Sequence, residues 1–218
     1  MSEQVKPTNL EKFMKLEEGK RDRIINAAMK EFSYGYKKAS TDAIVKEAGI
    51  SKGLLYHYFV SKEQLYTFLI RYAIDLLERD YYEMFSQNQQ DILESFWQIA
   101  LLKKDITAQH PFLYDFANGL YAHIADVPDA KIISQLEQEH QMYAEFYDQC
   151  DTSLFRDDID HRKAIDIISY TLDNLLSDEE GKAISAGGWE DDSYERFLDT
   201  LRGYLDIFRT CFYKKEDN

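Results

Sequence analysis

The sequence is poor in the residues that interrupt helices. Its 218 residues include only three prolines and nine glycines, and long stretches contain neither. Proline removes a backbone donor and glycine favours turns, so their scarcity argues against a fold of many short strands joined by tight turns. An all-helical protein is therefore the predicted fold class.

Cysteines and long apolar runs are also scarce. Cys150 and Cys211 are the only cysteines, and their spacing fits neither a disulfide framework nor a metal site. No apolar run approaches the roughly 20 residues needed to span a bilayer. The first residues lack the apolar core of a secretory signal. We therefore expect a cytoplasmic protein that does not bind a membrane.

The chain is acidic, but its charge is unevenly distributed. The 26 Lys and Arg residues against 40 Asp and Glu residues give a net charge of −14, which as an average argues against nucleic-acid binding. Residues 1–71, however, contain 13 basic and 9 acidic residues, whereas residues 72–218 contain 13 and 31. Such an asymmetry suggests two functions in one chain.

Apolar periodicity predicts about nine helices and no strand. In the first, over residues 19–34, Ile24, Ala27, Ala28 and Phe32 recur at three- and four-residue steps, and Gly35 ends it. The other predicted helices lie at residues 41–48, 52–59, 61–85, 91–109, 111–121, around 132–147, 161–177 with an extension to 186 left open, and 193–213. Residues 177–192 form the clearest internal break.

The two short helices in the basic segment have the form of a helix-turn-helix unit. Ser40 and Ser51 are suitable N-caps, and Gly49 lies in the turn between them. Ser61 and Gln64 form a capping box for the next helix. If Leu55 and Phe59 face inward, the second short helix directs a small, polar and aromatic set of residues outward, namely Ser51, Lys52, Gly53, Tyr56 and His57.

Such a face suits the major groove of DNA. Lys52 can donate to a guanine edge or a phosphate, and Thr41 can offer a hydroxyl and an N–H to a phosphate. Lys37, Lys38 and Lys62 flank the unit and can reach the DNA backbone. An ordinary interpretation also exists, in which Tyr56 and Tyr58 are core aromatics, His57 is a surface histidine and the lysines are solvated.

The run from Ile24 to Leu65 closely resembles the DNA-binding domain of the TetR family of bacterial transcriptional regulators. The segment AGISKGLLYHYF, residues 48–59, and SKEQL, residues 61–65, carry most of the resemblance. It implies that three N-terminal helices bind DNA, that a larger helical domain binds a small ligand, and that the last two helices form a four-helix dimer interface. The implied DNA contacts are Lys37, Lys38, Thr41, Ser51, Lys52, Gly53, Tyr56, His57 and Lys62.

The resemblance sets the expected domains and function. We expect a flexible arm at residues 1–18, the helix-turn-helix domain at 19–64, and a ligand-binding and dimerisation domain at 65–218. The protein would be a homodimeric regulator that binds a pseudo-palindromic double-stranded DNA operator and acts as a repressor. A small-molecule effector would release it from the operator through a movement of the long helix at 61–85. The alternative is an all-helical module that binds a small molecule or a partner protein and has lost DNA binding.

Aromatic and apolar stripes in the acidic part suggest where effector and partner subunit bind. Most aromatic residues there must be core, but helix-lined ligand pockets also use them. We predict pocket-lining roles for Phe96, Phe112, Phe116, Tyr143 and Tyr147. An apolar or aromatic effector would fit, and the surrounding acids leave a cationic one open. The predicted dimer interface consists of Ile165, Ile168, Leu172, Leu175, Phe197, Leu201, Tyr204, Leu205 and Phe208.

No enzyme chemistry, cofactor or metal is expected. The sequence contains no glycine-rich phosphate loop and no nucleophile–base arrangement. His110, His123, His140 and His161 are spaced so that no two share a helix face, which argues against a metal site. The acids at positions 157, 158 and 160 are interpreted as a solvated loop with Asp160 as an N-cap.

Overall fold

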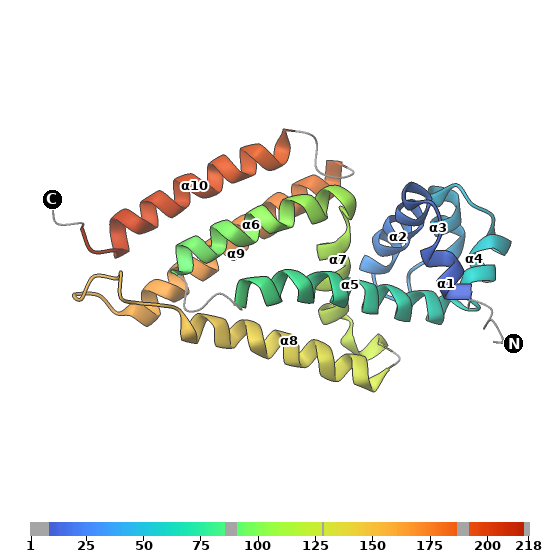
Figure 1. The fold of residues 1–218 in the computed structure, drawn as a ribbon, viewed down its shortest axis with the longest axis horizontal. Helices are drawn as coiled ribbons and strands as arrows, with labels where there is room; N and C mark the ends of the chain where they lie inside the picture. The colour runs from blue at the N-terminus through green and yellow to red at the C-terminus, as the bar shows by residue number, and fades with distance from the viewer. Residues whose placement is uncertain (1–8, 86–90, 128, 187–191, 216–218) are drawn as a thin grey trace, which may run out of the picture. The chain divides into compact units, whose positions relative to one another are not determined.

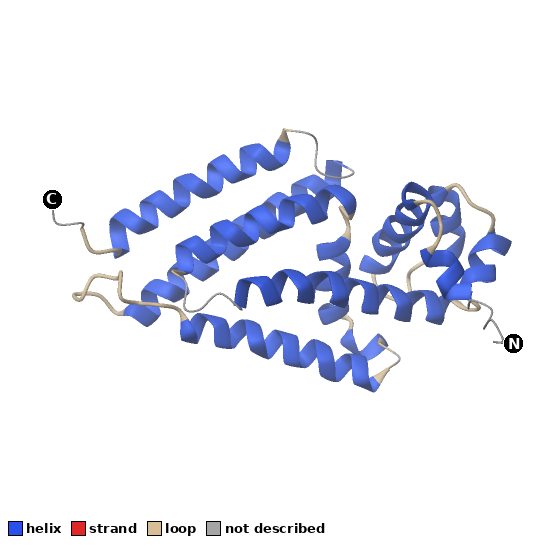
Figure 2. Cartoon of the chain, in the orientation of Figure 1, coloured by secondary structure: helices blue, strands red, loops and turns tan. Residues whose placement is uncertain are grey.

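The structure is a computed structural model that describes residues 9–85, 91–127, 129–186 and 192–215. The described residues form helices joined by loops, with no strand beyond one isolated antiparallel bridge between Phe155 and Tyr213 (Figures 1 and 2). The helices are α1 (Asn9–Met14), α2 (Glu18–Ser33), α3 (Thr41–Ala48), α4 (Lys52–Tyr58), α5 (Lys62–Phe85), α6 (Ile92–Gln109), α7 (Leu113–Ala122), the short 3-10 helix η1 (Ile124–Asp126), α8 (Ala130–Gln149), α9 (His161–Ala186) and α10 (Ser193–Phe212). The all-helical prediction is confirmed.

The structure adds three details to the predicted helices. Helix α1 lies within the predicted N-terminal arm, and its Phe13 is fully buried. Helix α7 begins at Leu113, two residues after Pro111, which lies in a turn. Helix α9 continues through Gly181 to Ala186, which is the extension that the sequence left open.

The chain divides into two compact units. The first comprises Met1–Leu76 with Gln109–Glu137, and the second comprises Leu77–Ala108 with Gln138–Asn218. In the first unit, the predicted apolar face of α2 is buried and packs against α3 and α7. Helix α7 approaches α2 so closely that a Cβ on Gly119 would lie 2.6 Å from the carbonyl oxygen of Ser33. Any larger residue at 119 would therefore force the two helices apart.

The core of the second unit is formed by α6, α9, α10 and the loop before α9. Phe155 and Ile168 are fully buried in it. Tyr194, at the start of α10, donates a hydrogen bond of 2.7 Å to the carbonyl of Ala100 on α6. This core holds the unit together from segments that are far apart in the sequence.

The residues predicted for the dimer interface lie mostly in this core. Within one chain the structure already buries Ile165, Ile168, Leu172, Phe197, Leu201, Leu205 and Phe208, and Leu175 packs against them. Tyr204 is exposed to 38%. The apolar stripes of α9 and α10 therefore face each other and α6, which corrects the assumption that one chain could not cover them. Other apolar side chains of these helices are exposed, as described below.

Candidate nucleic-acid interface

Side-chain caps define the ends of α3 and α4. The hydroxyl of Ser40 accepts from the N–H of Ala43 at 3.3 Å, and that of Ser51 accepts from Leu54 at 3.1 Å. Between the helices, Gly49 has a φ of +66°, a left-handed conformation that disfavours residues with a Cβ. The predicted caps and turn are confirmed, and they fix the angle at which α4 leaves α3.

Helix α4 buries one face and exposes the other, as predicted. Leu55 and Phe59 are 1% and 2% exposed, and the ring of Phe59 packs edge-on against Phe13 of α1 with centroids 4.8 Å apart. The opposite face presents exposed side chains or backbone at Ser51, Lys52, Gly53, Tyr56 and His57. Tyr58 is half-buried against Phe13, which agrees with its interpretation as a core aromatic.

Two of the predicted DNA-contacting residues lie next to each other across the turn. The hydroxyls of Thr41 on α3 and Tyr56 on α4 are 3.4 Å apart. Both helices therefore contribute polar groups to one surface. A surface of hydroxyl and aromatic groups at this spacing can contact a phosphate and a base edge together.

Asp42 also belongs to this surface, although the sequence analysis did not single it out. Its carboxylate lies 2.8 Å from the ammonium of Lys52, and this hydrogen-bonded pair raises the pKa of Lys52. The two residues are ten positions apart on different helices, so only the geometry of the turn brings them together. In the sequence, Asp42 has an ordinary explanation, because an acidic residue in the first turn of α3 stabilises the helix through its dipole.

The three flanking lysines have different environments. Lys37 is 82% exposed along its side chain, and its ammonium lies 2.6 Å from Asp126 of η1. Lys38 is exposed. The ammonium of Lys62 lies over the ring of Tyr36, 4.6 Å from its centroid, and its half-buried side chain is thus held within the domain. Lys38 is the flanking lysine that a phosphate can approach without displacing an interaction with Asp126 or Tyr36.

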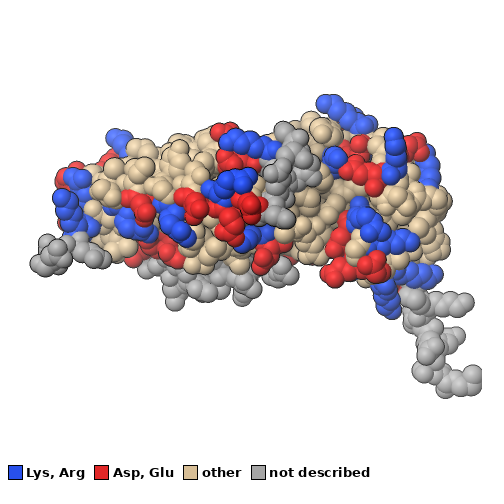
Figure 3. Space-filling view, turned by 90° about the horizontal axis from the view of Figure 1, so that it is seen from above, with Lys and Arg blue, Asp and Glu red and all other residues tan. Residues whose placement is uncertain are grey.

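Charges of both signs are interspersed over the described surface in the view of Figure 3. Within the basic segment, the side chain of Asp42 is exposed beside Lys52, so this surface is not a uniform basic patch. Bulk attraction would contribute less to DNA binding than it does for strongly basic proteins. Any recognition of DNA by this surface would therefore have to rest on specific contacts.

The aromatic residues predicted to line an effector pocket are found in different places. Phe112 and Phe116 belong to the core of the first unit, where Lys30 lies over the ring of Phe112 at 5.2 Å and Phe116 meets Tyr66 edge-on. Phe96 is half-buried against the core of the second unit. The side chains of Tyr143 and Tyr147 lie outside the described residues.

The acids of the loop before α9 have protein partners. Asp157 pairs with Lys214, Asp158 pairs with Arg156, and Asp160 accepts from the N–H of Lys163 at 3.2 Å as the predicted N-cap of α9. In the described part of the chain, no three histidine, cysteine, aspartate or glutamate residues are grouped so that they could hold a metal ion. Within the same residues, none of the helices combines the length and the apolar character needed to cross a membrane.

Comparison with known proteins places this geometry in a family. The model of the bacterial regulatory proteins of the tetR family matches residues 24–67. The HTH-type transcriptional regulator UidR of Escherichia coli (strain K12) is 54% identical over 46 residues, which are 21% of this chain and 24% of that protein. The same match is found with UidR of Shigella flexneri. The aligned region spans about a quarter of these relatives.

Solved structures extend the likeness to the fold of the whole chain. A TetR family transcriptional regulator from Chloroflexus aurantiacus is 20% identical with a TM-score of 0.58, covering 94% of this chain and 98% of that one. A gamma-butyrolactone receptor described as ArpA-like is 23% identical with a TM-score of 0.51, covering 87% and 97%. At these identities the likeness concerns the fold. Residues 24–67 belong to the tetR family of bacterial regulatory proteins, and the chain has the fold of a TetR family regulator.

Proposed function

We propose that this protein is a transcriptional regulator that binds double-stranded DNA through the exposed face of α4. The observation that carries the proposal is the division of α4 between a buried face at Leu55 and Phe59 and an outward face from Ser51 to His57. The family match covers this helix and its caps. The contacts proposed on the DNA are those predicted from the sequence, with Lys52 and Tyr56 at their centre.

The protein acts in this proposal as a homodimer, with a second copy covering exposed apolar side chains of the last two helices. Ile167 and Tyr170 on α9 are 49% and 70% exposed, and Tyr204 and Ile207 on α10 are 38% and 59% exposed. Solvent-exposed apolar groups of this size on two packed helices are typical of an interface. Two-fold symmetry would then place two copies of α4 in successive major grooves, about 34 Å apart.

We further propose that a small molecule bound within residues 65–218 releases the protein from DNA, which makes it a repressor. Phe96 together with Tyr143 and Tyr147 is the retained part of the predicted pocket, because Phe112 and Phe116 fill the core of the first unit. The second function considered, a helical module without DNA binding, is disfavoured because the outward residues of α4 have no core role.

Selection from a pool of random DNA duplexes tests the proposal. The purified full chain should enrich an inverted repeat whose half-site centres are about 10 base pairs apart or slightly more. Binding to the enriched duplex should weaken steeply with salt because phosphate contacts release counterions. If repeated rounds enrich no sequence at low salt, with and without small-molecule extracts, the DNA-binding proposal fails.

A further inference from the structure

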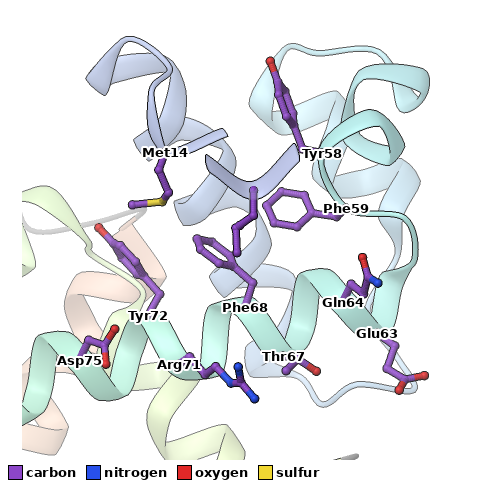
Figure 4. Close-up of a pocket in the computed structure, with 11 residues that line it drawn as sticks. Met14, Tyr58, Phe59, Glu63, Gln64, Thr67, Phe68, Arg71, Tyr72 and Asp75 are labelled. Carbon is purple, nitrogen blue, oxygen red and sulfur yellow. The ribbon is translucent and has the colours of Figure 1, made fainter. Parts of the chain in front are cut away.

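A cavity of about 480 Å³ lies in the first unit, beside the C-terminal end of α4 (Figure 4). Its walls come from α1, α4 and the first half of α5, and its size is within the range of small-molecule sites. Figure 4 shows the side chains of Met14, Phe59, Phe68 and Tyr72 converging on it. Among the predicted pocket residues whose side chains the structure describes, Phe96, Phe112 and Phe116 do not line it.

The floor of the cavity is a cluster of aromatic rings. Phe13 is fully buried beneath it and packs edge-on against Phe68 with centroids 5.4 Å apart. Phe59 and Phe68 lie 5.2 Å apart, and Phe68 and Tyr72 lie 5.8 Å apart with an interplanar angle of 32°. Leu10 and Met14 form an apolar rim that is 42% and 40% exposed. Such a surface favours a flat, aromatic ligand.

Hydrogen bonds hold the ring of Tyr72 in place as one wall. The Nδ2 group of Asn26 donates to the carbonyl of Gln109 at 2.9 Å. Oδ1 of Asn26 therefore faces His110 and accepts a hydrogen bond of 2.9 Å from its Nδ1–H group. Nε2 of His110 is then the acceptor for the Tyr72 hydroxyl at 3.0 Å. The wall is therefore pre-organised, which lowers the entropic cost of binding.

The charged groups around the cavity favour a cation. Glu63 and Asp75 line it, are exposed, and form no ion pair within the described part of the chain. The basic group in the lining, Arg71, is paired with Asp129 at 3.3 Å. The net charge offered to a ligand is negative, and the aromatic faces add attraction for a cation.

We propose that this cavity binds a small aromatic cation. The ring of the ligand packs on Phe68 and Tyr72, and its positive group lies toward Glu63 or Asp75. The ligand also contacts Tyr58 and Phe59, which end α4. Any effect on DNA reading rests on the proposed function, whereas binding itself does not.

Three probes that share one ring system and differ in charge test the proposal. The probes are 1-naphthylmethylammonium, the neutral 1-naphthylmethanol and the anionic 1-naphthylacetate, each titrated against the full chain by calorimetry. The ammonium should bind best, and the double variant Glu63→Gln/Asp75→Asn should weaken it about fivefold. The matched control, Asp105→Asn/Glu137→Gln, removes two exposed carboxylates outside the cavity and should bind as the parent does.

Hydrogen exchange locates the bound probe. The ammonium should slow amide exchange in peptides that contain residues 9–14 and 58–75. Equal affinity for all three probes, no loss in the cavity variant relative to the control, or slowed exchange only in other peptides would each overturn the proposal. Circular dichroism confirms that each variant is folded before it is compared.

Discussion

At the residue scale, Asp42 is the most informative side chain of the candidate interface. It forms an ion pair with Lys52 on the surface that is proposed to meet DNA. A phosphate or base that binds Lys52 must compete with this carboxylate. Asp42 would therefore limit affinity for any DNA sequence that does not offer a compensating contact, and this favours specific over nonspecific binding.

The variant Asp42→Asn tests this role. Removing the carboxylate should tighten binding to random-sequence duplex by about threefold, roughly the value of one exposed charge interaction, and should steepen the logarithmic salt dependence by up to about one unit. Fluorescence anisotropy over a series of salt concentrations measures both quantities. Asp105→Asn, an exposed acid of α6, is the control. An unchanged affinity would show that Asp42 does not approach DNA.

His110 allows a prediction of pH dependence. Burial lowers the pKa of His110 below its ordinary value, and its Nε2 accepts from Tyr72 in the neutral form. The unfolded chain therefore binds a proton at this histidine more readily than the folded chain as the pH falls below about 6.5. The neutral, buried His110 thus contributes to stability above that pH, and the contribution is lost as the pH falls.

Denaturant unfolding at about pH 7.5 and about pH 5.5 measures the effect. The parent protein should lose stability toward the lower pH with a slope of at most about 1.4 kcal/mol per pH unit from this group. His110→Phe should be less stable at both values but should show a smaller difference between them. Identical slopes in the parent and in His110→Phe would contradict the assignment.

At the scale of elements, sequence signals located helices well where local chemistry ends them. Ser40, Gly49 and Ser51 act locally, and the structure places α3 and α4 between them as predicted. Helix α1 is different because its buried residue, Phe13, contacts residues 59 and 68, which are distant in sequence. The Asp42 pair and the aromatic cavity share this dependence on tertiary contacts, which local periodicity does not contain.

Gly49, in the turn between α3 and α4, should contribute to stability through its backbone conformation. Its φ of +66° imposes strain on a residue with a Cβ, although no neighbouring atom lies within 4 Å of one. Gly49→Ala should lower the free energy of unfolding by about 1 kcal/mol. Gly181→Ala, within α9 and equally uncrowded, should raise it by up to about 1 kcal/mol. Denaturant unfolding of both variants checks this, and equal effects would exclude backbone strain as the cause.

At the scale of the whole molecule, the predicted dimer depends on which face of α9 and α10 is exposed. Periodicity identified the apolar stripes but could not show that α6 covers them, because covering is a property of the packed chain. In the described parts of α9 and α10, the large apolar side chains that remain exposed are Ile167, Tyr170, Tyr204 and Ile207. The proposed interface therefore lies on the two helices predicted from the sequence, but its residues differ from most of those predicted.

Sedimentation at micromolar concentration tests the dimer. The parent protein should sediment as a dimer, and Ile207→Glu combined with Tyr170→Glu should shift it toward monomer, because two buried carboxylates would lack partners. Leu154→Glu is the matched control, since Leu154 is 46% exposed in the same unit but lies in a loop. A monomeric parent protein, or equal effects of both changes, would contradict the proposed interface.

The net charge of −14 describes the molecule poorly as an average. The acidic residues after position 71 would repel DNA at long range, so in the proposed function the basic segment binds DNA through defined contacts. The outward face of α4 supplies these contacts in the proposal. Removing very few of its side chains should therefore weaken DNA binding strongly.

The most direct measurement is the affinity of Lys52→Ala/Tyr56→Ala for the selected duplex, by anisotropy at fixed salt. We predict a loss of about 100-fold, because two contacts of roughly 1–3 kcal/mol each are removed. The matched control is Lys131→Ala/Tyr121→Ala, in which Tyr121 is 39% exposed against 37% for Tyr56. The control should bind as the parent does. Equal affinities of the two folded double variants would contradict the account.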